Sequence, residues 1–383
     1  MRIVSVLVMV TGLLAHPAFA QDTSGVTDDE IVLGQSCALE GPAKALGIGM
    51  RAGLLAYFGK INAAGGINGR TIRLVSKNDG YEPPKAIENT RTLINEEKAF
   101  ILIGEVGTPT SKAVVPIAEE ANIPFFGPFT GAEFLRDPFK PWVINVRASY
   151  YQEMEALARY LVDKKGLKKI ACLYQNDGYG QAGLSGIERA LKRRSMQLAE
   201  TGTYERNTTA VKSALLKIRN AKPDAVVMVG AYEPCAEFIK LAKKVGMSDK
   251  IYCNISFVGT KALLEALGEA GDGCIISQVV TFPWDESVPI VKEYTTDMGR
   301  YQPQADRGFV SLEGYMVGKL FCQVVQAVDG ELTRQSFVQA LDKTGTFDLG
   351  GVNLHFGPAD HQGSDEVFLT IIRDGKIQPL KED

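Results

Sequence analysis

Two pairs of small and polar residues follow neighbouring predicted strands in the first half of the sequence. Gly107 and Thr108 come after one apolar run, and Thr130 and Gly131 come after the next. In an open parallel sheet a ligand lies beyond the carboxyl ends of the strands, so these residues are expected to meet there. Free backbone N–H groups, hydroxyl groups and a helix N-terminus at one place suit a carboxylate. Ordinary helix capping by Thr108, with Pro109 in the first turn, is the alternative interpretation.

Aromatic residues stand at the corresponding strand ends of the second half. Tyr179 follows the strand predicted over 169–174, and Tyr232 follows the strand predicted over 225–230. A tyrosine offers a rigid apolar face and one hydroxyl group, which suits the binding of a small ligand. Packing of either tyrosine at the protein surface is the alternative interpretation.

The sequence carries no motif for catalysis or for a cofactor. The segment after the first predicted strand, 35–41, lacks the GxGxxG pattern, and neither GxxxxGK[ST] nor GxSxG occurs. The three histidines are His16, His355 and His361, which leaves little for a zinc site or a histidine-based triad. We therefore expect no enzymatic activity, no metal and no cofactor.

The charge and the cysteine content bear on two further questions, nucleic-acid binding and disulfide formation. The net charge is −3 and no run of Lys or Arg is longer than three, so the chain has no basic footprint for nucleic acid. Six cysteines show no CxxC spacing, and buried, inert thiols are the commoner outcome for such positions. They are Cys37, Cys172, Cys235, Cys253, Cys274 and Cys322.

Residues 1–20 have the pattern of a signal peptide. Arg2 gives the positive start, an apolar stretch follows, and Ala18-Phe19-Ala20 is a small-x-small cleavage pattern. The apolar stretch is shorter than the roughly 20 residues that a membrane-spanning helix needs. We expect cleavage after Ala20 and export of a mature chain that begins at Gln21, with an uncleaved anchor as the alternative.

Apolar periodicity predicts short strands that alternate with helices over residues 30–280. The expected strands are 30–37, 70–77, 100–104, 123–127 and 142–146 in the first half, and 169–174, 197–204, 225–230, 250–254 and 274–280 in the second. The expected helices are 47–63, 83–97, 110–121, 151–165, 180–194, 209–220 and 235–245. Repeated strand–helix–strand units require parallel pairing, which predicts two successive doubly wound α/β halves.

The remaining segment is expected to pack back onto these halves rather than to form a third domain. Helices are predicted over 287–301, 306–328 and 333–343. A terminal pair of strands, 352–356 and 366–372, is predicted to follow them.

The chain resembles the leucine/isoleucine/valine-binding protein type of periplasmic receptor over essentially all of the predicted mature sequence. The segments that carry the likeness are, in order, Ile31-Val32-Leu33-Gly34, Gly41-Pro42, Ile61-Asn62-Ala63-Ala64-Gly65-Gly66-Ile67-Asn68-Gly69, Asp79-Gly80-Tyr81-Glu82-Pro83, Ile103-Gly104, Ile123-Pro124 and Tyr179-Gly180. The resemblance implies a type I periplasmic binding protein, an α/β fold of two doubly wound lobes that are joined by three hinge crossovers and close on a ligand.

The resemblance also implies the lobe boundaries and the ligand site. The N-terminal lobe would comprise 28–146 plus 280–349, and the C-terminal lobe 147–279 plus 350–383, with crossovers near 145–147, 277–280 and 349–352. The ligand carboxylate would lie on Gly107 and Thr108 together with Phe129, Thr130 and Gly131, and the closing aromatic residues would be Tyr179 and Tyr232.

One departure from the family bears on the ligand. In the amino-acid binders an acidic side chain after the last strand of the second lobe holds the ligand ammonium, and Ser256 stands nearest to that position here. A buried ammonium without a partner is costly unless Asp177 or Glu233 takes the role. Phe126, Phe129 and Phe257 are expected to line the pocket. We therefore expect a carboxylate with an apolar or aromatic body and no α-amino group, with a branched-chain amino acid as the alternative.

The resemblance implies a periplasmic capture subunit of an ABC importer, which would be monomeric and would pass its ligand to permease subunits in the membrane. The same fold also serves ligand-sensing modules that report to a membrane receptor or kinase, and the sequence does not separate the two roles.

Overall fold

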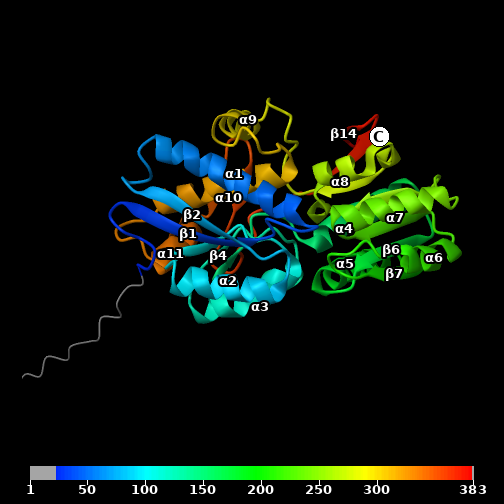
Figure 1. Ribbon diagram of the computed structural model, residues 1–383, viewed down its shortest axis with the longest axis horizontal. Coiled ribbons are helices and arrows are strands. Elements are labelled where there is room, and N and C mark those ends of the chain that lie inside the picture. Colours follow the sequence, from blue (N-terminus) through cyan, green and yellow to red (C-terminus); the bar gives the residue numbers. More distant parts are fainter. Residues whose placement is uncertain (1–22, 382–383) are drawn as a thin grey trace, which may run out of the picture.

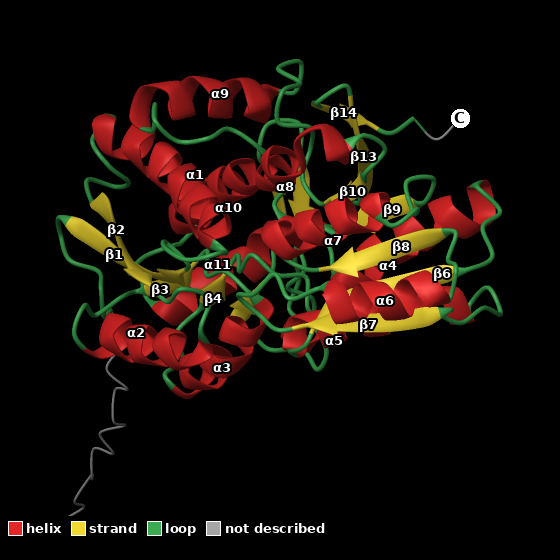
Figure 2. Ribbon diagram, turned by 45° about the vertical axis from the view of Figure 1, so that its right-hand side comes forward, coloured by secondary structure: helices red, strands yellow, loops and turns green. Residues whose placement is uncertain are grey.

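The computed structural model describes residues 23–381, and its two large sheets lie at opposite ends of the molecule (Figures 1 and 2). The predicted signal peptide, the cleavage after Ala20 and the new start at Gln21 lie outside the described residues. No helix of the described part is long and apolar enough to cross a membrane.

The first sheet is entirely parallel, with the order β2-β1-β3-β4-β5. Its strands are β1 (Glu30–Cys37), β2 (Thr71–Asn78), β3 (Ile101–Ile103), β4 (Phe125–Phe126) and β5 (Val143–Ile144). The connecting helices are α1 (Lys44–Ala63), α2 (Pro83–Asn95) and α3 (Thr108–Glu120). Because parallel strands need crossover connections, these helices cover both faces of the sheet, and Figure 1 shows α1 on one side with α2 and α3 on the other.

The second sheet has the order β14-β13-β10-β9-β8-β6-β7. Its parallel strands are β6 (Ile170–Gln175), β7 (Glu200–Tyr204), β8 (Ala225–Val229), β9 (Ile251–Asn254) and β10 (Ile275–Gln278). Two antiparallel strands, β13 (Phe368–Arg373) and β14 (Lys376–Pro379), extend one edge. The helices of this part are α4 (Tyr150–Ala158), which continues as a π-helical segment (Arg159–Lys164), α5 (Gly178–Lys192), α6 (Lys212–Asn220), α7 (Tyr232–Lys244) and α8 (Thr260–Leu267).

Three later helices return to the first sheet, namely α9 (Pro289–Tyr301), α10 (Phe309–Gln326) and α11 (Arg334–Thr344). Both α9 and α10 pack against α1, and α11 packs against α10. We call the five-stranded sheet with α1–α3 and α9–α11 the first lobe, and the seven-stranded sheet with α4–α8 the second lobe. The mixed α/β architecture with parallel-rich sheets confirms the predicted fold class. The predicted residue boundaries of the lobes stay a prediction.

Both segments of the predicted terminal strand pair, 352–356 and 366–372, contain a strand, but the two strands do not pair with each other. The first of these segments contains β12 (Asn353–His355), which pairs with β11 (Thr346–Asp348), and the second contains β13, which pairs with β10 and β14. Helix α8 was also not predicted. The partner strands β11 and β14 are short, so their apolar alternation is too brief to show in the sequence.

All six cysteines are buried in the described part and form no disulfide. Burial raises the pKa of the Cys274 thiol to about 12 and shifts the pKa of Cys235 and Cys253 in the same direction. A buried thiol with a raised pKa is a poor nucleophile, so these side chains act as small apolar core residues.

The closest approach between α1 and α10 depends on Gly53. A Cβ atom at this position would lie 1.9 Å from the carbonyl oxygen of Ser311 and 2.5 Å from the backbone nitrogen of Tyr315. Both neighbours are backbone atoms of a packed helix, so neither can move aside without shifting that helix.

We predict that Gly53→Ala lowers the free energy of unfolding by about 1–3 kcal/mol, because it overpacks the contact between α1 and α10. Gly299→Ala is the matched control, because Gly299 is an exposed glycine of α9 with no neighbouring atom within 4 Å of the added Cβ. Urea denaturation of both variants measures the difference. Equal stability of the two variants would contradict the predicted close approach.

Candidate functional site

The hydroxyl groups of Thr108 and Thr130 meet at the carboxyl ends of β3 and β4. Their Oγ1 atoms are 2.6 Å apart, and both side chains are buried. The alternative interpretation, in which Thr108 only caps α3, does not hold, because the helix begins at Thr108 itself and its N-cap residue is Gly107. The Thr108 hydroxyl group is therefore not used for capping and faces Thr130 instead.

Two glycines let tyrosine rings approach this threonine pair. A Cβ atom on Gly107 would lie 2.3 Å from the ring of Tyr81, and the φ angle of Gly107 is 111°, which favours glycine. A Cβ atom on Gly131 would lie 2.6 Å from Cδ1 of Tyr150. The hydroxyl group of Tyr150 in turn lies 3.5 Å from Oγ1 of Thr108, which links α4 of the second lobe to the first lobe.

Aromatic side chains from both lobes pack together beside the threonines. The ring centroid of Phe257 lies 5.5 Å from that of Phe129, 5.9 Å from Tyr81 and 4.5 Å from Tyr179, and the Tyr179 ring lies 5.5 Å from Tyr150. Tilted rings at such distances attract one another beyond simple burial of area. The structure therefore brings Thr108, Phe129, Thr130, Tyr179 and Phe257 together in one buried contact between the lobes.

Arg147 lies in the same contact, although it was not predicted as a site residue. It follows β5 where the chain passes from the first lobe to the second, and it is 1% exposed. Its guanidinium carbon lies 4.8 Å from the centre of the Phe129 ring. The sequence shows a charged residue at a predicted crossover but does not show its burial, so sequence reasoning had no means to select it.

Two carboxylates, one from each lobe, flank the guanidinium group. Nη2 of Arg147 lies 3.3 Å from Oε1 of Glu153 in α4, and Nη1 lies 3.6 Å from Oε1 of Glu313 in α10. Burial lowers the pKa of Arg147, but Glu313 and Glu153 outweigh that effect and the net shift is upward. Burial raises the pKa of Glu313 to about 7 even though Arg147 opposes that shift.

Ser256 belongs to this ionic group. It receives a hydrogen bond from Nη2 of Arg147, and its own N–H and Oγ donate to Glu153 at 2.8 and 3.0 Å. Ser277 adds a fourth donor to Glu153, with its Oγ 2.6 Å from Oε2. Ser256, which stands nearest to the position that the family resemblance gives to an ammonium-binding acid, thus hydrogen-bonds Glu153, a carboxylate that already accepts four hydrogen bonds.

Asp177 and Glu233 were suggested as alternative partners for a ligand ammonium, and neither forms a free carboxylate beside Ser256. Asp177 accepts from the backbone N–H of Tyr179 as the N-cap of α5 and pairs with Arg206 at 2.9 Å. Glu233 is exposed in the first turn of α7. Asp177 is therefore already paired, and Glu233 is exposed to solvent.

Two predicted residues lie outside the cluster. Tyr232 is buried at the contact between the lobes, where its hydroxyl oxygen lies 3.5 Å from the backbone nitrogen of Ala45, but its ring packs against none of the aromatic residues described above. The expectation that Phe126 lines the pocket is wrong. Its ring packs on Phe321 and Phe337 in the core of the first lobe, because the side chains of a strand point to the faces of the sheet and not beyond the end of the strand.

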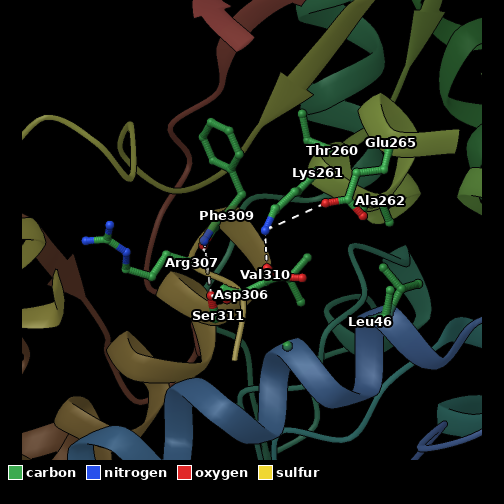
Figure 3. A pocket seen from close by; sticks show the side chains of 14 residues that line it. Leu46, Thr260, Lys261, Ala262, Glu265, Asp306, Arg307, Phe309, Val310 and Ser311 are labelled. Carbon is green, nitrogen blue, oxygen red and sulfur yellow. Dashed lines mark hydrogen bonds and ion pairs between the residues drawn. The ribbon is translucent and has the colours of Figure 1, made fainter. Parts of the chain in front are cut away.

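A separate pocket opens between the lobes beside α8 (Figure 3). Its wall combines the start of α1, the start of α8 and the segment 306–311, and the amino group of Lys261 pairs with Asp306 and Glu265. The cavity has a volume of about 70 Å³. That volume suits a few water molecules, whereas pockets for small organic ligands usually measure about 300–1,000 Å³. This cavity is therefore too small for such a ligand.

The sequence pattern of the family described as "Periplasmic binding protein" matches residues 30–376. The chain belongs to the periplasmic binding protein family. A Brucella abortus relative named "Leu/Ile/Val-binding protein homolog 7" is 27% identical over 225 residues, which cover 57% of this chain and 56% of the relative. The matched region thus spans little more than half of that curated relative.

Solved structures of this family superpose closely. A possible leucine/isoleucine/valine-binding protein from Rhodopirellula baltica is 39% identical, with a TM-score of 0.89 over 94% of this chain and 99% of the other. A solute-binding protein of an ABC transporter from R. palustris, solved with benzoate, is 24% identical, with a TM-score of 0.80 over 92% of this chain and 95% of the other. The family match and the 39% identical R. baltica structure support the expectation that this periplasmic binding protein is a solute-binding protein and not an enzyme.

Polar contacts at the edge of the aromatic cluster also join the lobes of this periplasmic binding protein. Arg206 follows β7 in the second lobe, and its Nη2 lies 2.9 Å from Oε2 of Glu82 in the first lobe. Nδ2 of the neighbouring Asn207 donates to the carbonyl oxygen of Gly80 at 3.1 Å and to Oε1 of Glu82 at 2.7 Å. These bonds exist only while the lobes are together, so they stabilise the closed arrangement.

We predict that Arg206→Ala weakens ligand binding by about two- to fivefold, since a partly exposed ion pair contributes up to about 1 kcal/mol. Arg193→Ala is the matched control, because Arg193 pairs with Glu155 within the second lobe. Calorimetric titration gives the affinities, and small-angle scattering reports the closed fraction. If both variants bind as the wild type does, the contact between Arg206 and Glu82 does not stabilise closure.

Proposed function

We propose that this chain is the solute-binding subunit of an ABC importer in the periplasm, and that its lobes close on a small carboxylate at the aromatic cluster. The observation that carries the proposal is the buried contact in which Thr108 and Thr130 of the first lobe meet Tyr150, Tyr179 and Phe257 of the second. Hydroxyl groups beside the N-terminus of α3 favour an anion, and the rings favour an apolar body.

The ligand class follows from the polar and apolar parts of this contact together. An aromatic or aliphatic acid would place its carboxylate on the threonine hydroxyl groups and its body among the rings. A branched-chain amino acid is the alternative, which the name of the Brucella relative favours. The benzoate complex of the R. palustris protein supports the acid, because it demonstrates that the same fold accommodates an aromatic carboxylate.

The partners would be permease subunits in the membrane, and the chain would act as a monomer. A ligand-sensing module for a membrane receptor or kinase is the second candidate, because that role requires the same closure. Genes for permeases and ATPases beside the gene of this protein would favour import, and a neighbouring receptor or kinase gene would favour sensing.

A thermal-shift screen of the mature chain tests the proposed ligand class. We predict that a binding carboxylate at about 100 times its Kd raises the Tm by about 5 °C, because it stabilises the folded state by about 2.7 kcal/mol. The panel would hold aliphatic and aromatic carboxylates, amino acids, amides and sugars. A shift with sugars or amides alone would contradict the proposal.

We predict that Thr108→Val weakens the binding of the best carboxylate by about tenfold or more, because hydrogen bonds to charged groups contribute about 1.5–3 kcal/mol. Thr296→Val is the control, since Thr296 is exposed in α9 and bonds only to the carbonyl oxygen of Lys292. Calorimetric titration of both variants measures the effect. Unchanged affinity of the Thr108 variant would remove this residue from the site.

A further inference from the structure

We propose that Arg147 determines the specificity of the ligand site, because its guanidinium group binds the acid group of the ligand and excludes an ammonium group from that place. This inference rests on the proposed function, and it names the ligands as carboxylates without an α-amino group. Arg147 adds a charged partner to the uncharged ones, Thr108 and Thr130, that are proposed above for the same carboxylate.

The hydrogen bonding of Arg147 is incomplete. Nη2 donates to Glu153 and Ser256, whereas Nε and Nη1 have no hydrogen-bond acceptor within the described residues. A guanidinium group has donors only and keeps its charge at every physiological pH. Because the side chain is buried, these donors cannot turn to bulk water, and an oxygen-bearing ligand is the partner that would satisfy them.

The unsatisfied donors lie among the predicted ligand-binding residues. The guanidinium carbon is 4.8 Å from the centre of the Phe129 ring and 6.0 Å from that of Tyr150. Phe129 packs on Phe257, and the hydroxyl group of Tyr150 lies 3.5 Å from Thr108. A ligand held between the lobes by these residues therefore also meets Arg147.

The same arrangement disfavours an ammonium group. Ser256 stands where the amino-acid binders of the family have an acidic residue. Here its hydroxyl oxygen accepts a hydrogen bond from the guanidinium group of Arg147 instead. Glu153 accepts from Arg147, from Ser256 twice and from Ser277, so it is committed. An ammonium group also has only donors, so it could not satisfy Nε or Nη1, and its charge would be repelled by Arg147 in a low-dielectric surrounding.

Glu313 links ligand binding to a proton. Its Oε1 atom is 3.6 Å from Nη1 of Arg147, which is an ion pair but too long for a hydrogen bond, and burial raises its pKa to about 7. The other charged groups that act on it are Glu153 and Arg136. A carboxylate that reaches Nη1 adds a second negative charge beside Glu313, which raises its pKa further. Binding near pH 7 should therefore take up a proton at Glu313.

The direct test compares two acids that differ only by an amino group. Leucine is 4-methylpentanoate with an α-amino group, and phenylalanine is 3-phenylpropanoate with one. By calorimetric titration of the wild type at pH 7, we expect each des-amino acid to bind at least about tenfold more tightly than its amino acid. Titration in buffers of different ionisation enthalpy should show proton uptake, and Glu313→Gln should abolish that uptake.

Arg147→Gln should weaken the binding of the des-amino acids by about tenfold or more. It should also reduce the difference in affinity between each des-amino acid and its amino acid. Since this change leaves Glu153 buried without its cation, the double variant Arg147→Gln/Glu153→Gln, which removes both charges, keeps the test valid if the single variant fails to fold. Arg189→Gln is the matched control, because Arg189 lies 4.6 Å over the Tyr151 ring at an exposed place and should change neither affinity nor preference.

The outcomes separate this inference from the proposed function. If the wild type prefers leucine, or if removal of Arg147 leaves the preference within each pair unchanged, the inference is overturned while a carboxylate-binding importer subunit still stands. If the wild type binds none of the four acids and no other carboxylate, the proposed function itself fails.

Discussion

The burial of Arg147 is the constraint on which the contact between the lobes depends. A buried guanidinium group destabilises a protein unless carboxylates lie close to it, and here they come from different lobes, with Glu153 in α4 and Glu313 in α10. Arg147 therefore has both of its carboxylate partners only when the two lobes are close together. Ser256 and Ser277 donate hydrogen bonds to Glu153, so the second lobe holds this carboxylate rigidly. Glu313 is held less tightly, and a ligand can compete with it.

The parallel sheets explain why the other site residues converge on this cation. The segments that directly follow β3 and β4 carry Thr108 and Thr130, and those that directly follow β6 and β9 carry Tyr179 and Phe257. Figure 2 shows the two sheets on opposite sides of the region where these segments meet. Doubly wound sheets bind ligands at such strand ends, so two facing sheets form a site from two half-sites. Each half of the proposed site is built by its own lobe, so binding would depend on closure.

The strand ends were predictable, and so were the residues that follow them directly. Thr108, Phe129, Thr130, Tyr179 and Phe257 lie together in the structure, although their role in binding stays a prediction. The ionic network was not predictable, because nothing in the periodicity distinguishes a buried Arg147 or Glu313 from an exposed one. Phe126 was misplaced because it belongs to β4 itself, so its side chain points to a face of the sheet that helices cover and not beyond the end of the strand. The sequence also could not reveal that Ser256 accepts a hydrogen bond from Arg147, since the two residues are distant along the chain.

A crystal structure of the mature chain with the best-binding carboxylate tests the central claim most directly. The account predicts that the ligand lies between the lobes, with carboxylate oxygens within hydrogen-bond distance of Nε or Nη1 of Arg147 and its apolar body against Phe129 and Phe257. A ligand in the pocket beside Lys261 would contradict the account. So would a ligand between the lobes that turns its carboxylate away from a guanidinium group still paired only with Glu153 and Glu313.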